Sequence, residues 1–268
     1  MVASSASSAS PLLMPIPAYA YEKGGVRLAF FTAQGGVSQA PYESLNCSYG
    51  SQDERDNVNE NRRLVRLAMG AENASLVTLY QHHSSDVMVV EKAWSQNDAP
   101  KADGMVTTQK GIMLGILTAD CGPILFVDEE RAIIGAAHSG WRGTLLGVNE
   151  NVIDAMVKKG AQLEAIKVFI GPMIGQTSYE VGEDVYAQVL NHHPENACFF
   201  IKGKAEGKYM FDLPSLIEKS LQRKGIKHIL QLSMDTYQDE QRFFSYRRNY
   251  HRDISDYGRN ICAIMIAE

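Results

Sequence analysis

The sequence predicts an α/β fold of one extended domain. The chain of 268 residues is long enough to bury a large core, and 45% of its residues are hydrophobic. Apolar runs of strand length alternate with segments whose apolar residues recur every three or four positions, which is typical of amphipathic helices. No repeat or linker-like stretch interrupts this alternation. We therefore expect a flexible tail over residues 1–20 and a single domain over residues 21–268.

The expected elements follow in chain order. Apolar runs bounded by Gly, Pro or polar loops predict strands over residues 26–31, 44–50, 76–80, 87–90, 166–170, 228–232 and 261–266. Residues 53–69 predict a helix, because their apolar positions share one side and most arginines lie elsewhere. A short helix is expected around residues 184–190. A further helix starts with Asp212 as its N-cap, carries Pro214 early and ends at Gly225.

Composition narrows the range of partners and compartments. The net charge is −5 without a basic run, which argues against nucleic acid or an anionic membrane as the main partner. The first 17 residues lack the positively charged start of a signal peptide, and the proline-broken apolar stretch at residues 12–17 is too short to span a membrane. The four cysteines are scattered without C-x-x-C pairs, which is typical of the reducing cytoplasm.

The stretch from Gly115 to Gly143 carries the strongest chemical signal. Two apolar runs, 124–127 and 132–137, are separated by residues of turn composition, and each adjoins a polar cluster. If the runs pair as a hairpin, Cys121 and His138 meet at one edge of the sheet. A thiolate beside an imidazole is typical of a zinc site or of a Cys-His hydrolase. The alternative is a buried structural cysteine beside a hydrogen-bonded histidine.

A polar insertion between two apolar runs offers a third group. The segment Gln81–Asp86 contains two adjacent histidines. Neighbours in an extended chain point to opposite sides, so only one of His82 and His83 can face Cys121 and His138.

The cluster after His138 predicts an anion site. From Thr144 apolar residues recur at helical spacing until Gly160 ends the pattern. The preceding turn therefore leads into a helix N-terminus, where free N–H groups attract anions. With Arg142 in that turn, we expect phosphate or carboxylate to bind there.

The C-terminal region is dense in arginine and aromatic residues. The run Arg242–Arg248 is followed by Tyr257, Gly258 and Arg259. Paired arginines beside aromatics can bind phosphate and stack a base. The alternative is surface charge next to core aromatics.

Three motifs resemble one known family. They are Gln81-His82-His83, Thr118-Ala119-Asp120-Cys121-Gly122-Pro123 and Ala136-Ala137-His138-Ser139-Gly140-Trp141-Arg142-Gly143. In these motifs the chain is similar to the multicopper polyphenol oxidases (laccases), a family also described as zinc-dependent purine nucleoside phosphorylases. Shorter matches extend over almost the whole chain beyond the tail, at Gly35–Ser38, Ser44–Asn46, Glu60–Arg62, Ala102–Asp103, Gly171–Pro172, Tyr179–Val181, Phe243–Arg248 and Gly258–Arg259. The chain departs from the family pattern at Ala33-Gln34, where a basic residue is usual, and at Ser84, where glycine is usual.

The resemblance implies a fold, a metal site and a chemistry. The fold would be a sandwich of mixed sheets flanked by helices, similar to the cytotoxic necrotising factor-like deamidases. The metal ligands would be His83, Cys121 and His138, which leave a tetrahedral zinc with one open position. The activity would be phosphorolysis of adenosine, inosine, guanosine and 5′-methylthioadenosine, with deamination of adenosine at the same site.

Other site residues follow from the matched motifs. We expect Cys121, Asp120 and Arg142 to serve catalysis, with Asp120 or Glu180 as candidates for proton transfer or ribose contacts. The residues expected to bind substrate are Asn46, Gln81, Tyr179, Glu180, Arg247 and Arg248.

Three alternatives remain open. A four-copper laccase needs closely spaced H-x-H pairs, which this chain lacks, and more histidines than its seven: His82, His83, His138, His192, His193, His228 and His251. Copper would outcompete zinc for the same ligands, so phenol oxidation at that one site is the first alternative. The second is a metal-free amide hydrolase acting on peptidoglycan precursors, with Cys121 as nucleophile and His138 as base. The third is a scaffold without activity. The sequence leaves the oligomeric state open.

Overall fold

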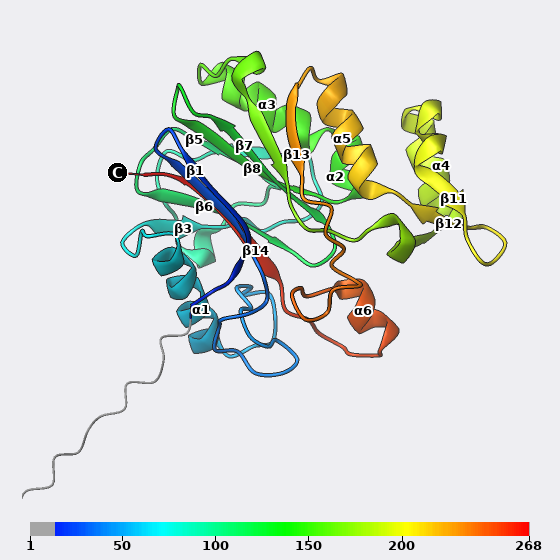
Figure 1. The fold of residues 1–268 in the computed structure, drawn as a ribbon, viewed down its shortest axis with the longest axis horizontal. Coiled ribbons are helices and arrows are strands. Elements are labelled where there is room, and N and C mark those ends of the chain that lie inside the picture. Colours follow the sequence, from blue (N-terminus) through cyan, green and yellow to red (C-terminus); the bar gives the residue numbers. More distant parts are fainter. Residues whose placement is uncertain (1–13, 268) are drawn as a thin grey trace, which may run out of the picture.

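The computed structural model describes residues 14–267, and its ribbon is drawn in Figure 1. The first strand, β1, spans Pro17–Lys23. The tail predicted over residues 1–20 is therefore too long at its C-terminal end, and its residues 1–13 lie outside the described part of the chain.

Two large sheets form the centre of the molecule. The five-stranded sheet has the order β1-β2-β14-β6-β3, where the further strands are β2 (Val26–Phe31), β14 (Asn260–Ile266), β6 (Ile112–Thr118) and β3 (Ser75–Val77). The six-stranded sheet has the order β13-β9-β7-β8-β5-β4, made of β13 (His228–Gln231), β9 (Lys167–Ile170), β7 (Gly122–Asp128), β8 (Ile133–Ser139), β5 (Gly104–Thr107) and β4 (Val87–Val89). Both sheets mix parallel and antiparallel pairs.

The two sheets pack face to face and each is also covered on its outer face. Leu125 and Val127 join a core with residues of the five-stranded sheet such as Leu28. Ile124 and Phe126 lie on the opposite side of β7, in a second core beneath the helices. Because successive side chains point to opposite faces of a strand, burial of both faces explains why β7 is apolar from Pro123 to Val127.

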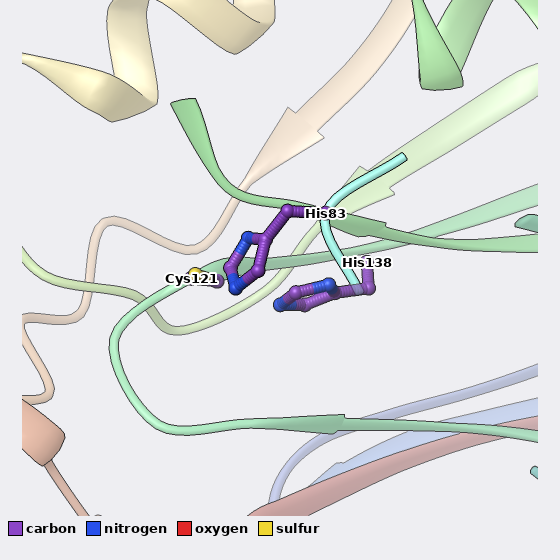
Figure 2. A group of neighbouring side chains, drawn as sticks. All are labelled: His83, Cys121 and His138. Carbon is purple, nitrogen blue, oxygen red and sulfur yellow. The ribbon is translucent and has the colours of Figure 1, made fainter. Parts of the chain in front are cut away.

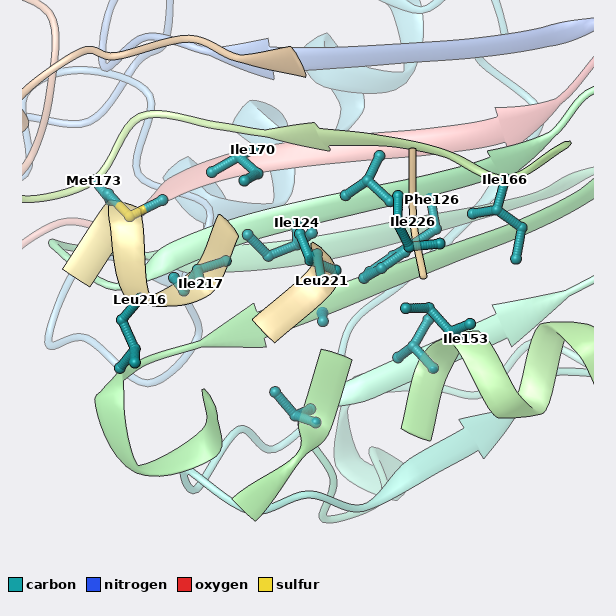
Figure 3. Close-up of a cluster of buried hydrophobic side chains, with 14 of the residues drawn as sticks. Ile124, Phe126, Ile153, Ile166, Ile170, Met173, Leu216, Ile217, Leu221 and Ile226 are labelled. Atoms are coloured by element: carbon teal, nitrogen blue, oxygen red, sulfur yellow. The ribbon is translucent and has the colours of Figure 1, made fainter. Parts of the chain in front are cut away.

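Helices complete the outer layers. The six-stranded sheet is covered by α3 (Val148–Lys158) and α5 (Leu213–Arg223), whose side chains interlock with it in Figure 3. The outer face of the five-stranded sheet packs against α1 (Arg55–Ala68). The predicted sandwich of mixed sheets flanked by helices is confirmed. Its similarity to the cytotoxic necrotising factor-like deamidases stays a prediction.

Smaller elements lie beside this sandwich. A three-stranded sheet consists of β10 (Glu180–Gly182), β12 (Lys208–Phe211) and β11 (Phe200–Lys202). The remaining α-helices are α2 (Trp141–Leu146), α4 (Glu183–His192) and α6 (Tyr246–His251), and the 3-10 helices are η1 (Gln96–Asp98), η2 (Leu163–Ala165), η3 (Gln176–Ser178) and η4 (Pro194–Phe199). Within residues 14–267, no helix combines the length and apolarity needed to cross a membrane.

Two local predictions were wrong. The helical pattern that begins at Thr144 belongs to two helices. The first, α2, starts earlier, at Trp141, and Gly147 separates it from α3 with a backbone φ of 89°. Residues 44–50 are turns and irregular chain instead of a strand. Their backbone is satisfied by side chains: the Asn61 amide donates to the carbonyls of Ser44 at 3.1 Å and Asn46 at 2.8 Å.

Candidate metal centre

The predicted hairpin brings the first two site residues together. Strands β7 and β8 pair antiparallel, with Pro123 opposite His138. Cys121 directly precedes β7 and His138 is the penultimate residue of β8, so both lie at the same end of the pair. The hairpin prediction is confirmed.

A loop supplies the third residue of the cluster. His83 lies between Tyr80 and β4, and its ligand atom lies within 4.8 Å of those of Cys121 and His138. Figure 2 shows the two imidazole rings side by side, with the sulfur of Cys121 next to the His83 ring. His138 is only 6% exposed, Cys121 is partly buried and His83 is exposed, so the cluster opens toward solvent on the His83 side.

The structure distinguishes between the two adjacent histidines. His82 is exposed and its Nε2 lies 3.9 Å from the Asp86 carboxylate, outside the three-residue cluster. His83 joins the cluster with a backbone φ of 65°, in the left-handed region that non-glycine residues seldom occupy. This turn of the backbone aims one histidine inward and leaves its neighbour outside.

A residue that the site prediction did not contain, Asp103, contacts both histidine segments. Its Oδ1 lies 2.7 Å from His138 Nδ1 and accepts the His83 backbone N–H at 3.0 Å. Its Oδ2 accepts the N–H of Ser84 at 2.7 Å and the Ser84 hydroxyl at 2.9 Å. The side chain of Asp103 is fully buried. The only sequence signal for Asp103 was its place in the matched Ala102–Asp103 pair.

The electrostatics of the three side chains follow from burial and from their contacts. Partial desolvation by the surrounding protein, with the nearby His138 second, lowers the pKa of His83 to about 4. Burial opposes the charged form of His138, but the Cys121 sulfur and the Asp103 carboxylate outweigh it and raise its pKa to about 9. Burial also disfavours the Asp103 anion, yet hydrogen bonds from His138 and Ser84 outweigh it and lower the Asp103 pKa.

Gly140 leaves the space in which His83 and Cys121 lie close together. A Cβ at this position would lie 2.9 Å from His83 Nδ1 and 3.0 Å from Cys121 Sγ. The backbone of Gly140 is extended (φ −77°, ψ 172°), so any residue could adopt its conformation. Absence of a side chain is therefore needed here for space, since any larger residue would displace His83 or Cys121.

An aromatic and cationic group lies near the centre. Tyr179 stacks on Phe211 with 5.6 Å between ring centroids, and the Arg247 guanidinium lies 5.2 Å above the Tyr179 ring. Burial, with the charge at Cys121 second, raises the Tyr179 pKa. Arg142 is exposed, lies 4.7 Å from the Trp141 ring centroid and contributes to lowering the His83 pKa. The predicted Tyr179, Arg142 and Arg247 therefore gather near the cluster.

Asp120 connects the centre to the C-terminal region. Its Oδ1 accepts the Thr236 hydroxyl at 2.7 Å and its Oδ2 accepts the Arg247 backbone N–H at 2.7 Å. It is 7% exposed, has a φ of 88°, and burial raises its pKa. Both carboxylate oxygens are thus engaged by the protein itself.

Three of the residues predicted to bind substrate form bonds within the protein. Gln81 makes a reciprocal pair with Leu117, donating to its carbonyl at 2.7 Å and accepting its N–H at 3.0 Å. Asn46 is fully buried and donates to Ser51 at 2.8 Å and to the Asp53 carboxylate at 2.9 Å. Arg248 is 8% exposed and donates to the carbonyls of Thr236, Tyr237 and Phe243. Asn46 and Arg248 are buried, and their binding of substrate stays a prediction.

Glu180 occupies an intermediate position. It begins β10, is partly buried, and its carbonyl accepts a hydrogen bond from the Arg247 guanidinium at 2.6 Å. This bond fixes Arg247 between Tyr179 and the start of β10.

The match to a known family covers nearly all of the described chain. The sequence model described as multi-copper polyphenol oxidoreductase laccase matches residues 27–267. The chain belongs to this family. The expected family resemblance is confirmed.

Curated relatives of this laccase-family chain carry a different name. Purine nucleoside phosphorylase RP494 of Rickettsia prowazekii is 36% identical over 191 residues, which cover 71% of this chain and 78% of that protein. Purine nucleoside phosphorylase YfiH of Escherichia coli is 34% identical over 226 residues, which cover 84% and 89%.

Solved structures of family members have the same fold. Protein NMB0706 of Neisseria meningitidis, from family DUF152, superimposes with a TM-score of 0.82 at 32% identity and covers 93% of this chain and 99% of its own. The hypothetical protein YfiH of Bacillus licheniformis superimposes with a TM-score of 0.83 at 30% identity, covering 90% and 92%.

Proposed function

We propose that the protein is a zinc-dependent purine nucleoside phosphorylase that acts on adenosine, inosine, guanosine and 5′-methylthioadenosine and deaminates adenosine at the same site. The observation that carries this proposal is the cluster of His83, Cys121 and His138. It lies in a chain that aligns over most of its length with proteins named purine nucleoside phosphorylase.

The donor set supports zinc as the metal. Two imidazoles and one thiolate are typical zinc ligands, and three protein ligands leave a position for substrate or water. The room that Gly140 leaves beside His83 and Cys121 fits such a set. Bound zinc would supply a Lewis acid next to the substrate. Copper binds the same donors, so we propose zinc with copper as the competing ion.

Arg142 and Arg247 are the groups that we propose for phosphate. Each stacks on an aromatic ring, Trp141 or Tyr179, and neither pairs with a carboxylate among the described residues. The predicted helix N-terminus adds little, because α2 has only six residues and few aligned peptide dipoles. Phosphate binding would therefore depend on the two guanidinium groups.

The reaction assigns roles to the remaining residues. In phosphorolysis a phosphate oxygen forms a bond to C1′ while the C1′–N9 bond breaks, and its electron pair leaves with the purine, which takes up a proton. In deamination, water replaces the amino group at C6 and ammonia leaves. We propose that Tyr179 and Glu180 orient the nucleoside, because they lie beside Arg247.

We propose that the buried polar residues shape the site without touching the substrate. Asp120 holds the Arg247 backbone at 2.7 Å, so we infer that it positions Arg247 and does not transfer the proton. Gln81 fixes the start of the His83 loop against β6. Asn46 and Arg248 brace neighbouring loops through their internal hydrogen bonds.

The first experiment combines metal content with product analysis. We expect native mass spectrometry of untagged protein to give about one zinc per chain, as a site with one open position would bind. Incubation with adenosine should release adenine only when phosphate is present, and inosine and ammonia in either case. Protein that retains zinc but leaves every nucleoside unchanged would contradict the proposed activity.

Arginine variants separate the two reactions. Arg142→Ala and Arg247→Ala should slow phosphorolysis by about 100-fold or more, because removal of a guanidinium that stabilises phosphate costs several kcal/mol. Deamination of adenosine should change far less, since it uses no phosphate. An equal loss of both reactions would assign these arginines to folding.

Two alternatives predict different outcomes. The family description favours copper-dependent polyphenol oxidation, which requires copper in the protein and oxygen uptake with phenols. The proximity of Cys121 and His138 would also suit an amide hydrolase acting on peptidoglycan precursors. That activity would resist chelators and be abolished by thiol alkylation, whereas the zinc enzyme should lose activity with a chelator and regain it with zinc.

A further inference from the structure

We propose that Asp103 is a positioning residue that holds both histidine ligands of the metal centre in place. The inference rests on the proposed metal site, but it does not depend on which reaction that site performs. Asp103 directly precedes β5, and its backbone carbonyl accepts the His138 N–H at 2.8 Å, which fixes it to the end of β8. Its carboxylate is fully buried between His138 and the His83 loop.

The first function of Asp103 is to set the tautomer of His138. Its Oδ1 lies 2.7 Å from Nδ1 of His138, so a proton on Nδ1 makes a hydrogen bond to the carboxylate. A neutral imidazole protonated at Nδ1 offers its lone pair at Nε2, the nitrogen on the other side of the ring. Carboxylates that accept from metal-binding histidines orient the ring and increase its basicity.

The second function is to fold the loop that carries His83. The backbone N–H groups of His82, His83 and Ser84 all point at the Asp103 carboxylate, at 3.2, 3.0 and 2.7 Å. Successive N–H groups around one anion form a small nest, which is stabilised by the negative charge. This wrapping occurs where His83 adopts a φ of 65°, a conformation that costs about 1 kcal/mol or more for a residue with a side chain.

Ser84 adds a side-chain bond to the same carboxylate. Its hydroxyl donates to Asp103 Oδ2 at 2.9 Å and also accepts the Asp86 N–H at 3.1 Å. A residue without a hydroxyl could not form either bond. The carboxylate therefore holds one ligand by its ring and the other by its backbone, and its loss should disturb both although all three ligands remain.

The test is zinc affinity of Asp103→Asn, measured by competition with a chromophoric chelator. An amide keeps the shape but loses the charge and turns one acceptor into a donor that faces other donors. We expect zinc to bind about 10- to 100-fold more weakly, the range seen when outer partners of metal ligands are removed. The cobalt-substituted variant should also show shifted visible bands, because ligand geometry changes.

The matched control is Asp128→Asn. Asp128 is a fully buried carboxylate that accepts the N–H of Arg131 at 3.2 Å and of Gln162 at 3.0 Å, at the other end of β7. The Asp128→Asn variant should be less stable, while its zinc affinity and cobalt spectrum stay as in the wild type. Equal losses of affinity in both variants, or wild-type affinity in Asp103→Asn, would overturn the proposal.

Two measurements do not depend on the folding of Asp103→Asn. Nitrogen NMR of the zinc-loaded wild type should show His138 protonated at Nδ1 and bound through Nε2; metal on Nδ1 would refute the inference. Ser84→Ala should weaken zinc binding by less than Asp103→Asn, and unchanged affinity would exclude the loop part of the inference. Because these readouts follow metal binding, failure of the nucleoside assays alone would count against the proposed function only.

Discussion

At the residue scale, Glu150 is a partly buried carboxylate, one of whose oxygens is buried without a hydrogen-bond partner. Among the described residues, its Oε2 is one of four buried side-chain atoms that make no hydrogen bond. Burial raises its pKa, although Lys224 and Arg223 partly oppose the shift. Because the folded pKa lies above the unfolded value, the carboxyl favours the folded state at low pH, and this contribution is lost as the pH rises through the folded pKa.

Glu150→Gln should therefore stabilise the protein at neutral pH. The amide removes the buried charge at constant shape, and we expect the free energy of unfolding to rise by about 1 kcal/mol at pH 7. The gain should shrink at pH 4, where the carboxyl is protonated. Urea unfolding at both pH values measures the difference, with the exposed Glu206→Gln as control. A gain that is independent of pH would contradict this explanation.

The sequence predicted the candidate metal ligands better than it predicted the residue that positions them. The proximity of Cys121 and His138 followed from strand length and turn composition alone, because antiparallel pairing places the start of one strand beside the end of the next. The alternation of side chains in a strand could not choose His83, since its loop is not extended and has a φ of 65°. Asp103 was missed because its role depends on contacts with residues 20 and 35 positions away.

At the element scale, the connection between β8 and α2 determines how closely the ligands approach. Gly140 is the N-cap of α2 and follows directly after β8. The same junction explains the misread helix: apolar spacing continues through Gly147, but a φ of 89° there redirects the chain into α3. The spacing of apolar residues indicates which side of a helix is buried, but it does not reveal such a break.

Gly140→Ala should weaken metal binding without straining the backbone. A methyl group 2.9 Å from His83 Nδ1 and 3.0 Å from Cys121 Sγ must displace one of them. We expect zinc affinity to fall by about 10-fold, similar to the loss of an outer partner of a ligand. His82→Ala, which alters an exposed neighbour outside the cluster, should bind zinc as the wild type does. Wild-type affinity in Gly140→Ala would mean that the ligands have room to move.

At the scale of the whole molecule, β7 connects the two cores. Adjacent residues Leu125 and Phe126 are both fully buried, one between the sheets and the other beneath the helices. The α/β class followed from the apolar runs, because strands with both faces covered are apolar along most of their length, whereas the layered sandwich was expected only from the family resemblance. The order of strands could not be predicted, since β14 lies between β2 and β6 but comes from the far end of the chain.

A single domain requires that both cores unfold together. Leu125→Ala and Phe126→Ala should each lower stability, by about 2–5 and 3–5 kcal/mol respectively, because each leaves a cavity in a packed core. The two tryptophans report on different cores, since Trp94 packs against the one between the sheets and Trp141 against the one beneath the helices. In single-tryptophan variants, each substitution should shift both fluorescence transitions equally. If Leu125→Ala moved only the Trp94 transition, the two layers would unfold separately and residues 21–268 would not act as one cooperative unit.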